Sequence, residues 1–158
     1  IQQTVVMSVA DGDSMVYIFK RDRVNEGLVY SSTVGQRRSL FYGALGRVLL
    51  AFKPEQQIEH LLEQPLSQWT PYTMTEKEVI RKCLKQIKED MVSIEIDEAA
   101  VGVTGIASPV FGSNGKVVAA VGVLGPSVQL VEEQLNTAKK LVLQTASSIS
   151  FNMGYSNE

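Results

Sequence analysis

The feature that most constrains the fold is a pair of apolar segments separated by a short turn, Val103–Phe111 and Lys116–Leu124. Both segments are rich in Val, Ile and Ala, and Ser113-Asn114-Gly115 lies between them. An Asn-Gly pair between such segments is a strong hairpin signal, because a two-residue type I′ turn needs positive φ at both central positions. The sequence therefore predicts a hairpin of two long strands.

The second strand of this hairpin has no polar face. Residues 117–121 are all apolar, whereas a strand with one solvated face alternates between apolar and polar residues. We therefore expect both faces to be covered, or one face to line a closed pocket. Gly105 and Gly122 interrupt the two strands, and a Gly inside a strand indicates a bulge or the close approach of another group. Helices packed on the sheet and a bound ligand would each explain them.

Composition and charge restrict the classes of function. The chain has 158 residues, enough for one domain with a core, and a formal net charge of −2, unlike a domain that binds nucleic acid by itself. One Cys and one His exclude an intramolecular disulfide and a Cys-rich metal centre, so no metal or cofactor is predicted. Without a signal peptide or an apolar segment of about 18 residues, we expect a cytoplasmic chain with no membrane partner. Because it begins at Ile1, we expect it to be a piece of a longer protein.

The remaining periodicities predict the elements around the hairpin. Strands are expected where β-branched residues are bounded by turn signals, and helices where apolar residues recur every three or four positions. Strands followed by helices, then strands and a last helix, indicate an α+β domain with a mostly antiparallel central sheet, flanking helices and a long C-terminal helix. The expected strands are Gln2–Ala10, Met15–Lys20, Gly27–Thr33 and Val92–Ile96, and the expected helices are Ser39–Phe52, Glu55–Glu63, one from Thr75 and one from Gly125-Pro126-Ser127 to Gly154.

Two of the predicted helices carry informative residues. Gly43 and Gly46 each cost the first helix up to about 1 kcal/mol relative to Ala, which indicates close approach of another backbone or a bound molecule. Thr75 and Glu78 have the spacing of a capping box. The helix that they begin is expected to turn four residues inward: Val79, Leu84, Ile87 and Met91.

Few residues suit catalysis. Cys83 and His60 lie on different predicted helices, so the thiol has no adjacent base and its expected state is inert. No Ser/His/Asp set, phosphate-binding loop or dinucleotide fingerprint is present, and we predict that the chain is not an enzyme. The acidic cluster of Glu95, Asp97 and Glu98, and the pair Arg37-Arg38, are compatible both with solvated turn charges and with contacts to a ligand.

Two segments resemble a known family. Residues 34–51, VGQRRSLFYGALGRVLLA, resemble a motif of the effector-binding domain of IclR-type bacterial transcription regulators. Residues 97–126 resemble a second and more specific motif of the same family, and the likeness extends over the whole chain. The residues that match the second motif are Asp97-Glu98, Gly102, Ile106-Ala107, Pro109-Val110-Phe111, Gly115, Val117–Val121, Val123 and Gly125-Pro126.

The resemblance implies a GAF-like fold in which residues 1–158 form one effector-binding domain. It also implies a winged helix-turn-helix domain that is absent from this chain and through which DNA would be bound. The expected partners are a small-molecule metabolite and further copies of the chain, in a homodimer or homotetramer. An enzyme on a GAF-like scaffold, such as a sulfoxide reductase, would require a second Cys, which the chain lacks.

The resemblance also implies an effector site formed by three parts of the chain. These are the segment that opens the first long helix, the turn around Asp97 and Glu98 (the acidic turn), and the inner face of the hairpin. Relatives that bind carboxylates often have Cys or Ser at three of these positions, where this chain has Gly or Leu. We therefore expect an effector larger or more apolar than glyoxylate or pyruvate, with Arg38 as its polar anchor. The alternative is a dimerisation module whose pocket is filled by Leu45 and Leu124. The predicted effector-binding residues are Arg38, Leu40, Ala44, Leu45, Glu95, Asp97, Gly105, Gly122 and Leu124.

Overall fold

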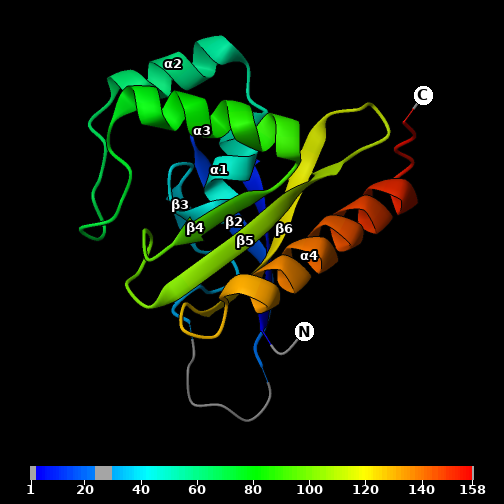
Figure 1. The fold of residues 1–158 in the computed structure, drawn as a ribbon. Coiled ribbons are helices and arrows are strands. Elements are labelled where there is room, and N and C mark those ends of the chain that lie inside the picture. The colour runs from blue at the N-terminus through cyan, green and yellow to red at the C-terminus, as the bar shows by residue number, and fades with distance from the viewer. Residues whose placement is uncertain (1–2, 24–29, 158) are drawn as a thin grey trace.

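The computed structural model describes residues 3–23 and 30–157, which form a curled antiparallel sheet with helices on both faces (Figure 1). Within these residues the sheet has six strands in the order β3-β2-β1-β6-β5-β4. The elements in chain order are β1 (Thr4–Asp11), β2 (Ser14–Arg21), β3 (Arg37–Ser39), α1 (Gly43–Ala51), α2 (Glu55–Glu63), α3 (Lys77–Asp90), β4 (Ser93–Ile96), β5 (Val103–Phe111), β6 (Val117–Pro126) and α4 (Glu132–Asn152).

The helices divide between the two faces of the sheet. Helix α1 packs on one face with α2 and α3 outside it, and the long α4 runs across β5 and β6 on the other face (Figure 1). This is the predicted α+β class, with a mostly antiparallel sheet, flanking helices and a long C-terminal helix. Every strand pair in the described part of the chain is antiparallel.

The β5–β6 hairpin lies between the two helical layers, which explains its continuous apolar sequence. Ile106 and Val123 pack with α4, whereas Ala107 and Ala120 face the core that contains α1. All residues of β5 between its two ends are buried. In β6 the residues from Ala119 to Val123 are buried, whereas Val118 is exposed. The central part of the hairpin is therefore covered on both faces, as the first of the two predicted alternatives requires.

The turn of this hairpin differs from the predicted two-residue type. The connection runs from residue 112 to 116, and only Gly115 in it has positive φ, at 73°. The Gly115 N–H donates to the Gly112 carbonyl oxygen at 3.0 Å, and the Asn114 side chain accepts from the Lys116 N–H at 3.0 Å. A longer loop needs one left-handed residue instead of two. Asn114 therefore does not supply positive φ, and stabilises the loop through the hydrogen bond of its side chain.

The third strand and the start of the first helix also differ from prediction. Of the predicted strand at 27–33, residues 27–29 lie outside the described residues and 30–33 form no strand. Instead Arg37–Ser39 pairs with β2. Because Ser39 belongs to this strand, it does not cap a helix; its hydroxyl accepts from the Phe41 N–H at 3.1 Å, and α1 begins four residues later.

The predicted boundaries of α2 are confirmed, but α3 and α4 start later than expected. The capping box is not formed, because α3 begins at Lys77 and its N-cap Glu76 makes no side-chain capping bond. Val79 and Met91 are exposed, and the buried residues of α3 are Ile80, Leu84 and Ile87. The last helix begins at Glu132 instead of directly after Ser127, and its buried residues are Ala138, Val142, Ala146 and Ser150.

Two glycines mark places where backbone segments approach each other. A Cβ on Gly122 would lie 2.2 Å from the Ile106 carbonyl oxygen, and a Cβ on Gly46 would lie 2.7 Å from that of Leu40. Both distances are too short for a side chain. Of the explanations left open for Gly46, the structure supports the close approach of another backbone segment.

We expect Gly122→Ala to destabilise the fold by about 2 kcal/mol or more, because the added methyl group collides with backbone that cannot move independently of the sheet. Val118→Ala on the same strand is the control, since Val118 is partly exposed and its loss should cost less than about 1 kcal/mol. Urea denaturation measures both. Equal losses of stability in the two variants would contradict this explanation of Gly122.

Candidate functional site

A small cavity lies at the N-terminal end of α1, bordered by strands from both halves of the sheet. Its volume is about 50 Å³. Its lining combines apolar side chains with hydroxyl groups and one carboxyl group. The lining residues are Met15, Tyr17, Tyr30, Ser31, Ser32, Tyr42, Gly43, Ala44, Leu45, Glu95, Ala99, Ala100, Val103 and Leu124.

The first residues of α1, Gly43, Ala44 and Leu45, line this cavity. Gly43, at the first helical position, has a φ of 67°, a conformation that only Gly adopts without strain. The N-cap Tyr42 makes no side-chain capping bond, and the first turn contains no acidic residue. First-turn N–H groups have no acceptor within their own helix, and the helix dipole favours negative charge beside them. This end of α1 is therefore suited to a hydrogen-bond acceptor or an anion.

Glu95 brings a carboxyl group into the same cavity from β4, although only 1% of the residue is exposed. Its Oε2 atom accepts from the N–H groups of Glu98 at 3.0 Å and Ala99 at 3.3 Å. Its Oε1 atom lies beside Gly105, its partner on β5, where an added Cβ would be 3.1 Å away. The missing side chain of Gly105 therefore leaves the space that this carboxyl group occupies.

The environment of Glu95 favours its neutral form. Burial raises the pKa of Glu95 to about 7, although the two N–H donors and the positive charge of Arg47 act in the opposite direction. Burial also raises the pKa of Tyr17 and of Tyr30, which keeps both phenols protonated. Among the described residues no Lys or Arg lines this cavity.

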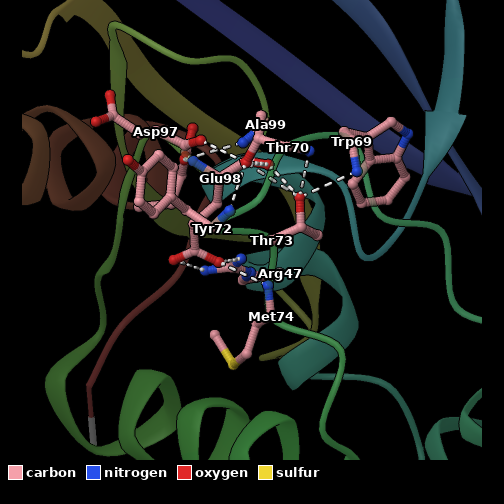
Figure 2. Close-up of polar contacts among 10 residues, drawn as sticks. Arg47, Trp69, Thr70, Tyr72, Thr73, Met74, Asp97, Glu98 and Ala99 are labelled. Carbon is pink, nitrogen blue, oxygen red and sulfur yellow. Dashed lines mark hydrogen bonds and ion pairs between the residues drawn. The ribbon is translucent and has the colours of Figure 1, made fainter.

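A buried ion pair holds the acidic turn against α1 (Figure 2). The guanidinium group of Arg47 binds both carboxylate oxygens of Glu98, with Nη1 at 3.2 Å from Oε1 and Nη2 bonded to Oε2. Glu98 Oε2 also accepts from the Met74 N–H at 3.3 Å. The side chain of Arg47 is 7% exposed and that of Glu98 18%, so the pair lies in an environment where an unpaired charge is costly.

The connection between α2 and α3 fixes the backbone of the same turn (Figure 2). Thr70 Oγ1 donates to the Asp97 carbonyl oxygen at 2.7 Å, and Thr73 Oγ1 donates to the Glu98 carbonyl oxygen at 2.7 Å. This turn donates the N–H groups of Glu98 and Ala99 to the Glu95 carboxyl group. The carboxyl group in the cavity is thus positioned by α1 and by the α2–α3 connection.

The structure brings about half of the predicted site residues together. Ala44, Leu45, Glu95 and Leu124 line the cavity. Gly105 does not line it but lies against the Glu95 carboxyl group.

The other predicted site residues lie outside the cavity wall. Arg38 lies over the Tyr42 ring at 4.7 Å, and its buried Nε has no hydrogen-bond partner. Leu40 is fully buried, with its carbonyl beside Gly46. The remaining two residues hold backbone together: Asp97 Oδ1 accepts from the Gly102 N–H and the Ser127 hydroxyl, and Gly122 lies against Ile106 of β5.

Sequence reasoning missed the tyrosines of the cavity and the role of Arg47. Tyr17 occupies an inward position on β2, Tyr30 follows the undescribed residues, and Tyr42 directly precedes the helix. The Tyr30 hydroxyl is buried and has no hydrogen-bond partner, which is uncommon for a buried polar group. The signal for Arg47 was a charged residue inside an otherwise apolar segment of α1.

No other constellation in the described residues suits catalysis or metal binding. Burial raises the pKa of the Cys83 thiol, which disfavours the reactive thiolate. His60 is exposed on α2. Within residues 3–23 and 30–157, no group of three or more His, Cys, Asp or Glu residues could hold a metal ion. In the same residues no helix has the length and apolar character to span a membrane.

Residues 1–151 match the family described as bacterial transcriptional regulator IclR C-terminal. This chain belongs to the IclR family. The HTH-type transcriptional regulator KdgR of Escherichia coli K12 is 32% identical over 155 residues, which cover 98% of this chain and 59% of that protein. The chain thus spans less than two thirds of this relative. As an IclR C-terminal domain it is a regulatory module, in agreement with the prediction that it is not an enzyme.

Solved structures confirm the IclR fold. The crystal structure of Thermotoga maritima IclR matches with a TM-score of 0.90 and 28% identity, over 98% of this chain and 62% of that one. An IclR homologue from Microbacterium hydrocarbonoxydans, crystallised in complex with 4-hydroxybenzoate, matches with a TM-score of 0.88 and 20% identity, over 97% of this chain and 61% of that one.

We expect Arg47→Met to destabilise the domain by about 3 kcal/mol, because it leaves the Glu98 carboxylate buried without its counter-charge. The control is Arg37→Met, since Arg37 pairs with Asp11 on the surface and such a pair contributes at most about 1 kcal/mol. Chemical denaturation of both variants at pH 7 is the measurement. Losses of similar size would show that burial of the Arg47 pair has no special effect.

The raised pKa of Glu95 predicts a pH-dependent stability. Because the folded state binds the proton more tightly than the unfolded state, stability falls as the pH rises from about 4.5 to about 7, by about 3 kcal/mol in all. Glu95→Gln should remove this contribution. Unfolding free energies of both proteins at pH 5 and pH 8 test it, and parallel pH profiles would contradict the assignment.

Proposed function

We propose that this IclR-type domain binds a small organic metabolite in the cavity at the N-terminal end of α1. The observation that carries this proposal is the convergence of the α1 N-terminus, three tyrosines and the Glu95 carboxyl group on one cavity. Two buried polar atoms at or beside it, the Tyr30 hydroxyl and Arg38 Nε, have no partner in the protein. A ligand with hydrogen-bonding groups would satisfy them.

The cavity must enlarge to receive an organic ligand. Its volume of about 50 Å³ is below the roughly 150 Å³ of a cavity that takes up benzene. Tyr30, Ser31 and Ser32 form one part of the wall outside the helices and strands, and Tyr42, Ala99 and Ala100 form another. Ala99 belongs to the turn that binds Glu95, and Tyr42 directly precedes α1. We infer that residues 30–32 move outward when the ligand enters.

The effector that we propose is larger or more apolar than glyoxylate or pyruvate. Ala44, Leu45, Val103 and Leu124 provide an apolar surface, and Leu124 offers no side-chain donor. Arg38, stacked on Tyr42 beside the cavity, would anchor a polar group of the ligand. The complex of the Microbacterium homologue with 4-hydroxybenzoate supports an aromatic acid as the first compound to test.

In the whole protein, ligand binding would change the arrangement of a DNA-binding domain. We propose that residues 1–158 form the single effector-binding domain of a cytoplasmic regulator, and that a separate N-terminal winged helix-turn-helix domain contacts DNA. The domain would also mediate homodimer or homotetramer formation. An effector can shift the regulator between two states only through different affinities for them.

The small cavity also favours a second candidate function. Leu45 and Leu124 both contribute to its wall, as expected for a pocket that has been filled by side chains. In that case the domain would serve as a dimerisation module without an effector.

Thermal unfolding with 4-hydroxybenzoate, glyoxylate and pyruvate distinguishes the two functions. We expect the aromatic acid alone to raise Tm by several degrees, since a hundredfold excess over Kd contributes about 2.7 kcal/mol. Ala44→Leu, which fills the cavity, should abolish the shift, whereas Gln56→Leu on the exposed face of α2 should retain it. A dimer in sedimentation with no shift for any acid would favour the dimerisation module.

A further inference from the structure

We infer that an anionic effector enters this cavity together with one proton, which the side chain of Glu95 carries. This inference rests on the proposed function and specifies the chemistry of the same site. It follows from the charges around the cavity, from its hydrogen-bond donors and from the position of the Glu95 carboxyl group.

The charged and titratable groups around Glu95 leave it without a free counter-charge. From α1 it faces Arg47, and from the acidic turn it faces Glu98. These two side chains bind each other in a bidentate pair, so the positive charge of Arg47 is already compensated. Tyr17, Tyr30 and Tyr42 contribute phenol groups to the wall, and burial raises the pKa of Tyr17 and of Tyr30. The residues of β5 and β6 that line the cavity carry no titratable group.

Arg38 does not change this balance. Its guanidinium group lies over the Tyr42 ring, 4.7 Å from the ring centroid, and the residue is not part of the cavity wall. From there it would anchor a polar group of the ligand that is remote from Glu95. The part of the ligand next to Glu95 meets no Lys or Arg in the cavity wall.

The cavity nevertheless favours an acceptor. The first-turn N–H groups of α1 and the hydroxyl groups of the lining residues are donors. A carboxylate group of a ligand would satisfy several of them. It would also lie against Glu95, whose Oε1 is directed to the space beside Gly43 and Gly105.

A ligand carboxylate in contact with Glu95 would bring two negative charges together beside a wall without Lys or Arg, which favours protonation of one of them. A single proton resolves the conflict: Glu95 keeps Oε2 as the acceptor for the N–H groups of Glu98 and Ala99, and its other oxygen donates O–H to the ligand carboxylate. At a pH above the pKa of Glu95, the proton is taken from solvent as the ligand binds. Below that pH it is already present.

The test is isothermal titration calorimetry with 4-hydroxybenzoate at pH 6 and pH 8, where the ligand carboxylate stays ionised and its phenol neutral. With a pKa of about 7 for Glu95, we expect Kd to be about tenfold weaker at pH 8 than at pH 6. Titrations at pH 8 in two buffers of different ionisation enthalpy should show uptake of close to one proton per ligand. For the neutral 4-hydroxybenzamide, which has no carboxylate, Kd at pH 6 and Kd at pH 8 should differ by less than about threefold.

Variants locate the proton. Glu95→Gln, which imitates the neutral acid, should bind 4-hydroxybenzoate with the same Kd at both pH values and without proton uptake. The matched control is Glu59→Gln, which removes a carboxylate that pairs with Arg81 on the surface and should keep the tenfold change. If Glu95→Gln does not fold, the proton uptake of the unmodified domain at pH 8 tests the inference: uptake of close to one proton per ligand supports it, and no uptake contradicts it.

The outcomes separate this inference from the proposed function. Binding of 4-hydroxybenzoate with one Kd at both pH values and no proton uptake would overturn the inference and leave effector binding intact. Absence of binding by both compounds at both pH values would overturn the proposed aromatic-acid site, and the inference with it.

Discussion

The ion pair between Arg47 and Glu98 is the interaction on which the arrangement of the candidate site depends. It joins α1 to the acidic turn across 51 positions of sequence. The turn that it anchors supplies the two N–H groups that hold Glu95. Since both side chains are largely buried, removal of either one would leave the other as an unpaired buried charge and destabilise the fold. The position of the carboxyl group in the cavity is therefore coupled to the packing of α1.

The sheet provides the second constraint. Because α1 and α4 cover opposite faces of β5 and β6, the hairpin lies at the centre of the domain and its side chains must fit two cores. Gly122 and Gly105 satisfy different needs in this arrangement. Gly122 allows two strand backbones to approach, whereas Gly105 makes room for the carboxyl group of Glu95. Two strand glycines that look alike in the sequence thus have separate functions, one structural and one within the candidate site.

The same contacts suggest how a ligand could affect the rest of a regulator. Helix α1 begins at the cavity, and its Arg47 contacts the acidic turn, which Thr70 and Thr73 connect to the segment before α3. A ligand at the N-terminus of α1 would therefore contact the helix and the carboxyl group of this network at once. Any change of shape that it causes must come from a difference in affinity between two arrangements of these elements.

The sequence by itself determined the elements that depend on local patterns. The apolar run of β6 indicated a hairpin that is covered in its central part, and the bounds of α2 followed from Pro54 and helical spacing. Prediction failed where a local pattern was overridden by a distant segment of the chain. Ser39 has the character of a helix N-cap, but it pairs with β2 as part of β3, so α1 begins at Gly43. Tertiary structure alone decided that Tyr17, Tyr30 and Tyr42 meet Glu95, and that Arg47 pairs with Glu98. Such contacts join residues far apart in the chain, and their geometry depends on how the helices pack on the sheet.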